Sequence, residues 1–326
     1  MRWEAVRKEC FTTSNKGCKT VAPDMPSKSK NLYNGLLNIN KPAGITSHDV
    51  VDRVRRILGQ KRVGHAGTLD PAATGILLVC VGRATRLVEY LVPGTKTYQG
   101  AIVLGRTTNT YDREGETTGE ADTAHLDREM VEGAMGSFIG EIEQVPPAYS
   151  AIKRNGVPAY KLARKGKSID LPARRIRIDS FELLEWESPR IDFRIVCQSG
   201  TYVRSVAHDL GAALKTGGYL ESLSRTASGS WKIDDSLSLE ELEEAADADG
   251  LKQLIRPLSE VLPDMPKVSV SEEQAGLLAN GQSLELEVDG QPETIGAWTS
   301  TGRLVAVMVP GGPGRWSPKK VFPAEV

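Results

Sequence analysis

The stretch Gly64–Leu77, GHAGTLDPAATGIL, combines three glycines and one proline with a single histidine and a single aspartate. Glycine and proline both destabilise a helix interior, so we expect an irregular loop that presents the carboxylate of Asp70. A carboxylate before proline is commonly a turn or cap residue. The glycines Gly64, Gly67 and Gly75 favour a functional site instead, because glycine lets the backbone approach a ligand closely.

Other glycine-rich signatures do not match this chain. The nearest approach to the P-loop pattern G-x-x-x-x-G-K-[ST] is Gly166–Ser168, which lacks the upstream glycine because Lys161 stands there. The patterns G-x-G-x-x-G and G-x-S-x-G are absent. Neither a dinucleotide-binding fold nor a serine hydrolase is therefore supported.

The composition of the whole chain is that of an ordinary globular protein. Of its 326 residues, 40% are hydrophobic and 25% are charged, and the formal net charge is -1. The length suits two domains, and the net charge gives no overall sign of nucleic-acid binding, so any basic surface must be local. The chain shows neither an apolar run of the roughly 18 residues a membrane span needs nor the apolar core of a signal peptide, so we expect a cytoplasmic protein.

The cysteines and histidines argue against a disulfide framework and a metal site. No C-x-x-C or H-E-x-x-H pattern occurs, and scattered cysteines fit a reducing compartment. We therefore expect no metal, although this argument does not address ligands far apart in the sequence. The residues concerned are Cys10, Cys18, Cys80, Cys197, His48, His65, His125 and His208.

Apolar spacing predicts a mixture of strands and helices. A cap at Thr46 or Ser47 followed by Val50, Val51 and Val54 indicates an amphipathic helix that ends near Gly59. Strands and helices alternate without regular βαβ repeats, so the predicted class is α+β. The predicted elements are a helix over 47–58, a strand over 76–82, a helix over 84–92, strands over 97–105 and 191–197, and a helix from about Val203.

Prolines near residue 264 mark a boundary between two predicted domains. Residues 1–30 are polar and irregular, so we expect a disordered extension, or a start codon that lies upstream of the true one at Met25. Residues 31–262 form the larger domain. Residues 265–326 contain one helical and several strand-like segments, which predicts a compact β-rich domain.

A second stretch with chemical potential lies between Tyr149 and Lys167. It contains six lysines and arginines, no acidic residue and two tyrosines. Such a run is often only a solvated face. In a chain with a net charge of -1, basic side chains interleaved with aromatic rings favour a nucleic-acid clamp, because the cations neutralise phosphates and the rings stack on bases.

A third stretch, CQSGTYVRSVAHDLG at 197–211, places Arg204 in the first turn of a predicted helix and off its apolar stripe. A cation at this end opposes the helix macrodipole. A carboxylate that pairs with Arg204 would compensate for this unfavourable interaction. The alternative interpretation is that Arg204 is an ordinary surface arginine.

Six motifs, in their order along the chain, resemble those of the TruB family, the tRNA pseudouridine-55 synthases. The resemblance covers residues 31–232, and the tail from about 265 is similar to the PUA RNA-binding domain of the family; residues 1–30 have no counterpart. It implies an α+β catalytic domain with a mixed sheet, followed by a β-rich PUA-like domain. The motifs are NINKPAGITSHDVV, GHAGTLDPAATGIL, KTYQGAIVLG, PPAYSAIKRNGVPAYKLARKG, GTYVRSVAHDLG and LSRTASG.

The resemblance further implies that the protein isomerises uridine 55 in the T-loop of tRNA to pseudouridine. Nothing is oxidised, reduced or hydrolysed in this reaction, so no cofactor is expected. Asp70 would be the nucleophile that meets a flipped-out uridine, and Arg204 would pair with it and hold its pKa down. Tyr98 would stack on the uracil and accept a proton. Leu223 would wall the pocket, and His65 would help to open the T-loop.

The basic stretch corresponds by resemblance to a thumb at about 146–168, which closes on the T-arm and recognises shape and phosphates. We expect a stand-alone monomer that acts on tRNA without a guide RNA. Two alternatives stay open, namely a guide-RNA-dependent subunit of a ribonucleoprotein and an RNA-folding protein whose catalysis is incidental. The expected substrate-binding residues of the thumb are Tyr149, Lys153, Arg154, Tyr160, Arg164 and Lys165.

Overall fold

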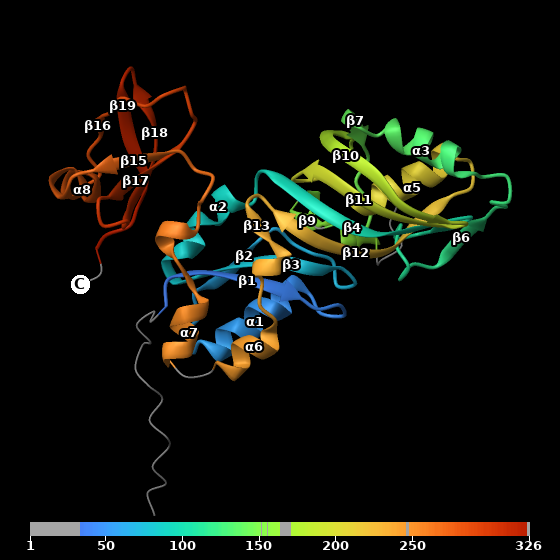
Figure 1. Cartoon of the computed structure of the whole chain (residues 1–326), viewed down its shortest axis with the longest axis horizontal. Helices are drawn as coiled ribbons and strands as arrows, with labels where there is room; N and C mark the ends of the chain where they lie inside the picture. The colour runs from blue at the N-terminus through green and yellow to red at the C-terminus, as the bar shows by residue number, and fades with distance from the viewer. Residues whose placement is uncertain (1–32, 151, 155, 164–170, 246–247, 325–326) are drawn as a thin grey trace, which may run out of the picture. The chain divides into compact units, whose positions relative to one another are not determined.

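The computed structural model of the chain (Figure 1) describes residues 33–150, 152–154, 156–163, 171–245 and 248–324. The extension expected over 1–30 lies outside these residues, as do Arg164 and Lys165 of the expected thumb. Within the described ranges, no helix is long and apolar enough to cross a membrane.

In the part of the chain that the structure describes, a mixed ten-stranded sheet forms the larger domain. Strands β3 and β12 pair in parallel, while the other strand pairs of this sheet are antiparallel, which confirms the predicted α+β class. The strand order is β14-β1-β3-β12-β4-β11-β10-β7, with β2 beside β3 and β13 beside β12. The strands are β1 (Gly35–Lys41), β2 (Val63–Ala66), β3 (Thr74–Val81), β4 (Thr95–Leu104), β7 (Gly140–Gln144), β10 (Arg174–Glu187), β11 (Arg190–Gln198), β12 (Gly218–Ser228), β13 (Trp231–Lys232) and β14 (Arg256–Pro257).

Strand β3 is covered on both faces, which explains why its sequence is almost continuously apolar. Leu77 and Val79 pack in a cluster with Val50 and Val54 of helix α1 (Ser47–Ile57). The side chains that alternate with them, among them Ile76 and Leu78, belong to a second cluster. The loop that carries Asp70 therefore leads directly into a strand that is packed on both faces.

Helix α1 begins where the sequence predicts. The side chain of Thr46 accepts a hydrogen bond from the backbone N–H of Asp49, and the Asp49 carboxylate accepts one from the backbone N–H of Thr46. This capping box satisfies two backbone donors that the helix itself leaves free. The predicted helix over 84–92 is instead a 3-10 turn at Gly82–Leu87 followed by the short α2 (Val88–Leu91).

The remaining elements of the larger domain lie on and beside the sheet (Figure 1). Helix α5 (Val203–Ala213) buries Val206 and Leu210 in the core cluster that contains the apolar residues of β10 and β11. The others are α3 (Arg128–Gly136), α4 (Ala159–Ala163), α6 (Leu239–Glu244), α7 (Ala248–Leu254), and the two-stranded ribbons β5 (Arg106–Thr108) with β6 (Thr117–Glu120) and β8 (Lys153–Arg154) with β9 (Val157–Pro158).

From Lys267 onward the chain forms a separate five-stranded sheet, as counted over the described residues, with helix α8 (Glu272–Ala279). Ala275 and Leu278 of this helix pack against Ile295 and Met308 in a core of their own. The predicted β-rich C-terminal domain is confirmed. Its strands, in sheet order, are β15 (Lys267–Val270), β17 (Ile295–Thr299), β18 (Leu304–Gly312), β19 (Arg315–Val321) and β16 (Leu284–Glu285).

The glycines on either side of Asp70 differ in backbone conformation and in the space that a side chain would have. Gly67 and Gly75 have φ angles of 85° and 94°, in the left-handed region that side chains avoid. At Gly75, where β3 passes β12, a Cβ would also overlap the main chain of Arg225. At Gly64 the nearest protein neighbour of a Cβ would be a methyl group of Thr85 at 4.0 Å, so the fold itself leaves room for a side chain there.

We predict that Gly75→Ala lowers the free energy of unfolding by about 3 kcal/mol or more, because the new Cβ meets both an unfavourable φ and fixed backbone atoms. Gly64→Ala is the matched control and should stay within about 1 kcal/mol of the original chain. Chemical denaturation followed by circular dichroism measures both. Equal stabilities would contradict a requirement for glycine at position 75.

Candidate active site

The loop that carries Asp70 is braced by hydrogen bonds to its backbone. The Ser47 hydroxyl accepts from the backbone N–H of Leu69 at 2.9 Å and donates to the Leu69 carbonyl oxygen at 3.0 Å. The ammonium group of Lys41, a fully buried side chain, donates to the Pro71 carbonyl oxygen at 3.1 Å. The residues on both sides of Asp70 are thus held by the last residue of β1 and the first residue of helix α1. Burial lowers the pKa of Lys41 to about 8, which leaves it charged at neutral pH.

Arg225 of β12 ties the two ends of the same loop together. Its Nε donates to the Ile76 carbonyl oxygen at 2.8 Å and its Nη2 to the Gly67 carbonyl oxygen at 3.0 Å, and the side chain is almost completely buried. Sequence reasoning gave Arg225 no role. The signal that could have found it is a charged residue within a segment that otherwise reads as a strand with core residues.

Arg204 finds the carboxylate partner that its position in the sequence predicts. Its Nε lies 2.9 Å from Oδ2 of Asp70, and its Nη1 lies 3.2 Å from Oδ2 of Asp112. The Nη2 donates to the Tyr149 carbonyl oxygen at 3.1 Å. Only 8% of the Arg204 side chain is exposed, so the alternative of an ordinary surface arginine is wrong.

Asp112 is the second carboxylate of the site, and sequence reasoning missed it. It lies in the loop between β5 and β6, where its Oδ1 accepts hydrogen bonds from the Thr110 hydroxyl at 2.6 Å and the Glu114 backbone N–H at 3.1 Å. An aspartate in a polar, glycine-containing segment has the sequence pattern of a turn residue. Only the fold brings it to Arg204.

The pKa of Asp70 lies above its ordinary value of 3.8. Burial in the protein is the main cause, and the charge of Asp112 acts in the same direction, whereas Arg204 and Lys41 lower the pKa. Arg204 therefore lowers the pKa of Asp70 as expected, but the net pKa is raised because desolvation outweighs the ion pair. The carboxylate still has a free face, since 45% of the Asp70 side chain is exposed.

That free face lines a cavity of about 380 Å³. Tyr98 from β4 and Leu223 from β12 line it together with Asp70 and Arg204, so the fold brings these four predicted residues to one place. Burial raises the pKa of Tyr98, which keeps its phenol neutral near neutral pH. Lys96, which the sequence did not single out, also lines the cavity, and burial lowers its pKa to about 8.

The other predicted residues lie elsewhere or are only partly described. His65 is on β2 and is not among the residues that line this cavity; burial lowers its pKa, which favours the neutral imidazole. Tyr149 reaches the site through its carbonyl oxygen. Of the thumb, Lys153 and Arg154 form β8 and Tyr160 lies in α4, whereas Arg164 and Lys165 are outside the described residues.

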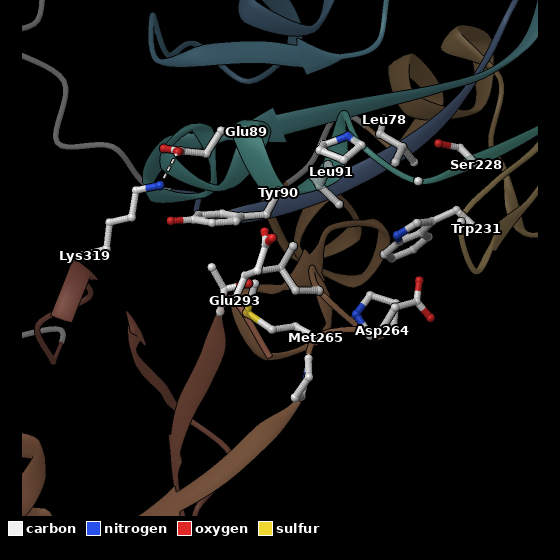
Figure 2. Close-up of a pocket in the computed structure, with 17 residues that line it drawn as sticks. Leu78, Glu89, Tyr90, Leu91, Ser228, Trp231, Asp264, Met265, Glu293 and Lys319 are labelled. Carbon is white, nitrogen blue, oxygen red and sulfur yellow. Dashed lines mark ion pairs between the residues drawn. The ribbon is translucent and has the colours of Figure 1, made fainter. Parts of the chain in front are cut away.

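A larger cavity, of about 500 Å³, is shown in Figure 2. Tyr90, Trp231 and Met265 line it, and Glu89 beside them is paired with Lys319 at 3.1 Å and with Lys320. Asp70 and the three predicted residues that line the smaller cavity with it, Tyr98, Arg204 and Leu223, do not line this larger one. We therefore place the candidate active site at the smaller cavity.

Among the described residues, no group of three or more histidine, cysteine, aspartate or glutamate side chains is arranged to hold a metal ion. Cys80 and Cys197 are buried thiols. The chemistry available in the smaller cavity is that of one open carboxylate, one guanidinium, one ammonium group and a neutral phenol beside an apolar wall. The carboxylate of this set can attack a flat ring between Tyr98 and the apolar wall as a nucleophile, or stabilise a cation formed during a reaction by an ion pair.

Comparison with family models gives consecutive matches along most of the chain. Residues 55–203 match the TruB family pseudouridylate synthase N-terminal domain. Residues 204–263 match the tRNA pseudouridylate synthase B C-terminal domain, and residues 265–323 match the tRNA pseudouridine synthase II C-terminal domain.

Similar proteins extend over almost the same length. A protein of Dehalococcoides mccartyi strain 195 named tRNA pseudouridine synthase B is 44% identical over 289 residues, which are 89% of this chain and 96% of that protein. One of Bacillus thuringiensis strain Al Hakam with the same name is 40% identical over 300 residues, covering 88% and 97%.

Two solved structures have the same fold. A protein in a Cbf5-Nop10-Gar1 complex has a TM-score of 0.68 at 26% identity, covering 88% of this chain and 83% of that chain. A protein in an H/ACA RNP bound to a substrate RNA containing 2'-deoxyuridine has a TM-score of 0.69 at 24% identity, covering 89% and 85%.

The raised pKa of Asp70 predicts how its removal changes stability with pH. The folded state keeps a proton on Asp70 at pH values where the unfolded chain, with a pKa of 3.8, has lost it. Stability from this group is present below pH 3.8 and is lost as pH rises through the folded pKa.

We therefore expect Asp70→Asn to unfold at a higher temperature than the original chain at pH 7.5, with a difference that shrinks toward pH 4. Calorimetry across this range measures it. Asp52→Asn, on the exposed face of α1, is the control and should show no such trend. A lower unfolding temperature of Asp70→Asn at pH 7.5 would mean that the ion pair outweighs desolvation.

Proposed function

Since the chain belongs to the TruB family and is a tRNA pseudouridine synthase, we propose that its target is uridine 55 in the T-loop and that Asp70 is its nucleophile. The proposal assigns residues 31–262, with the thumb at about 146–168, to catalysis and 265–326 to a PUA-like RNA-binding domain. The enzyme would work as a monomer in the cytoplasm, without a cofactor or a guide RNA.

In the proposed reaction the C1′–N1 bond of uridine breaks, the uracil turns within the cavity, and a C1′–C5 bond forms. The hydrogen on C5 leaves as a proton and N1 gains one, so the atoms and electrons balance without an oxidant or reductant. A carboxylate oxygen of Asp70 attacks either the ribose at C1′ or the uracil ring, and it is released when the new bond forms. Both routes require the ionised carboxylate.

The observation that carries this proposal is the asymmetry between the two partners of the ion pair. The Asp70 side chain is 45% exposed to the cavity, while the Arg204 side chain behind it is 8% exposed. The carboxylate can therefore meet a substrate while its guanidinium partner stays fixed by Asp112 and the Tyr149 carbonyl oxygen. This arrangement is preorganised, because the charges need not move when the substrate enters.

The size and lining of the cavity agree with a flipped-out pyrimidine. Tyr98 supplies a flat ring and Leu223 an apolar wall, which favour an uncharged base between them. Because burial keeps the Tyr98 phenol neutral, we assign it stacking first. Once C5 is bonded to C1′, Tyr98 would act as proton acceptor by taking the proton from C5 while its own hydroxyl proton passes to solvent.

Recognition of the rest of the tRNA is proposed to come from the thumb and the C-terminal domain. The six basic residues between Tyr149 and Lys167 would contact phosphates, and His65 would help to open the T-loop. Relatives that are 40–46% identical carry the name tRNA pseudouridine synthase B, which favours the stand-alone enzyme over a guide-dependent subunit.

We expect Asp70→Asn to abolish isomerisation and to leave tRNA affinity unchanged. The amide is nearly isosteric but carries no charge and is a poor nucleophile, and most affinity should come from contacts to the RNA backbone. Single-turnover release of tritium from a T-arm with 5-tritiated uridine measures the reaction, and filter binding to the same RNA measures affinity.

Asp52→Asn is again the control for the loss of one carboxylate and should react normally. Residual turnover of Asp70→Asn within about tenfold of the original chain would exclude Asp70 as nucleophile, since removal of a nucleophile typically costs far more. A parallel collapse of affinity would instead point to a role of the loop in binding.

The combined change of Lys153, Arg154, Arg164 and Lys165 to alanine should weaken tRNA binding and reduce its dependence on salt. Each phosphate contact contributes close to one unit to the slope of log affinity against log salt concentration. The control is Arg128→Ala on α3, which is paired with Glu132 at 2.7 Å. An unchanged slope in the fourfold variant would show that the thumb does not form the electrostatic clamp.

A further inference from the structure

Tyr111 has an unusual backbone conformation beside the active site. Its φ angle is 65°, in the left-handed region that bulky side chains adopt only when the surroundings impose it. The residue directly precedes Asp112, which pairs with Arg204. A glycine or asparagine would make the same turn with less strain, so the tyrosine side chain needs a reason to be there.

The side chain of Tyr111 stacks on that of His208. The ring centroids are 3.9 Å apart and the planes differ by 12°. His208 lies in α5 one turn after Arg204, so both side chains are on the same face of this helix. Burial lowers the pKa of His208, which favours a neutral ring in the stack.

Two consecutive loop residues thus contact two positions of α5 that are one turn apart. Asp112 meets Arg204, and Tyr111 meets His208. On its other side the loop is attached to β12, because the Leu220 backbone N–H donates to the Tyr111 carbonyl oxygen at 3.0 Å and the Leu220 carbonyl oxygen accepts from the Arg113 backbone N–H at 3.0 Å. The ring stack therefore sets the loop's position against the helix, while β12 sets its position against the sheet.

We propose that Tyr111 and His208 form a clasp that holds Asp112 against Arg204 and so aims the Arg204 guanidinium at Asp70. The two are positioning residues, since neither lines the 380 Å³ cavity. The inference rests on the proposed roles of Asp70 and Arg204. Without the stack the loop can rotate about its attachment to β12, Asp112 leaves, and Arg204 is no longer held from two sides.

Kinetics on the T-arm substrate test the clasp with Tyr111→Gly, which removes the ring and the backbone strain together. We expect kcat to fall by roughly 10- to 100-fold, the range associated with a misplacement of about 1 Å, while KM and the unfolding temperature do not worsen. Tyr111→Phe keeps the stack and should stay within about twofold, since offset ring stacking does not require the hydroxyl. Lys215→Gly is the matched control, because Lys215 has a φ of 60° at the end of α5 and its replacement relieves strain without touching the stack.

The partner ring gives an independent arm of the experiment. His208→Ala should lower kcat as much as Tyr111→Gly does, His208→Phe should restore most of the activity, and the double variant should be no worse than either single one, because both remove one interaction. A normal kcat in Tyr111→Gly, equal losses in Tyr111→Phe and Tyr111→Gly, or additive losses in the double variant would each overturn the clasp.

Failure of the clasp and failure of the proposed function give different results. If Tyr111→Gly is fully active and Asp70→Asn is inactive, the clasp is wrong and the function stands. If Asp70→Asn itself remains active, the nucleophile is wrong whatever the Tyr111 variants do. Should Tyr111→Gly lower the unfolding temperature, the comparison of His208→Phe with His208→Ala, which leaves the loop sequence intact, decides the question.

Discussion

The guanidinium of Arg204 lies between the carboxylates of Asp70 and Asp112, at 2.9 Å and 3.2 Å, with 8% of its side chain exposed. A buried cation left without any carboxylate partner typically destabilises a protein by about 3–5 kcal/mol, so this group constrains everything that touches it. The Asp70 loop, the loop between β5 and β6 and the start of α5 must all stay in place for the pair to exist. Burial is the main cause of the raised pKa of Asp70, and the charge of Asp112, the second carboxylate on the same guanidinium, adds to it.

Besides Arg204, two buried cations hold the Asp70 loop through carbonyl oxygens. Lys41 donates to the Pro71 carbonyl, and Arg225 donates to the carbonyls of Gly67 and Ile76. The loop backbone is thereby fixed on both sides of Asp70 without using up its charge. Such support from surrounding groups is what allows a reactive side chain to sit on a loop and still be positioned as on a regular element.

The same fold occurs in a protein of a Cbf5-Nop10-Gar1 complex and in a protein of an H/ACA RNP, at TM-scores of 0.68 and 0.69. A shared fold does not by itself carry the choice of target. In this chain we propose that this choice rests with the basic stretch near 149–167 and the C-terminal domain. The cavity with Asp70 and Tyr98 is proposed to carry out the chemical step.

The sequence by itself determined those features that depend on residues close to one another along the chain. The helix cap near Thr46, the apolar run of β3, the need for glycine at positions 67 and 75 and the unbalanced charge of Arg204 were all predictable from residues close together in the sequence. Only the tertiary structure decided which carboxylates meet Arg204. Asp112 had no distinguishing local pattern, and the partners of both Asp112 and Arg225 come from elements distant in sequence.

The direction of the Asp70 pKa was likewise beyond the sequence. A nearby cation was predictable from the motifs, but desolvation depends on how many atoms from separate elements enclose the carboxylate. The stack of Tyr111 on His208 is of the same kind, since it joins a loop and a helix that meet only after the sheet has formed. Sequence specified the reactive groups, and tertiary packing specified their environment, because solvation and long-range pairing are properties of the assembled chain.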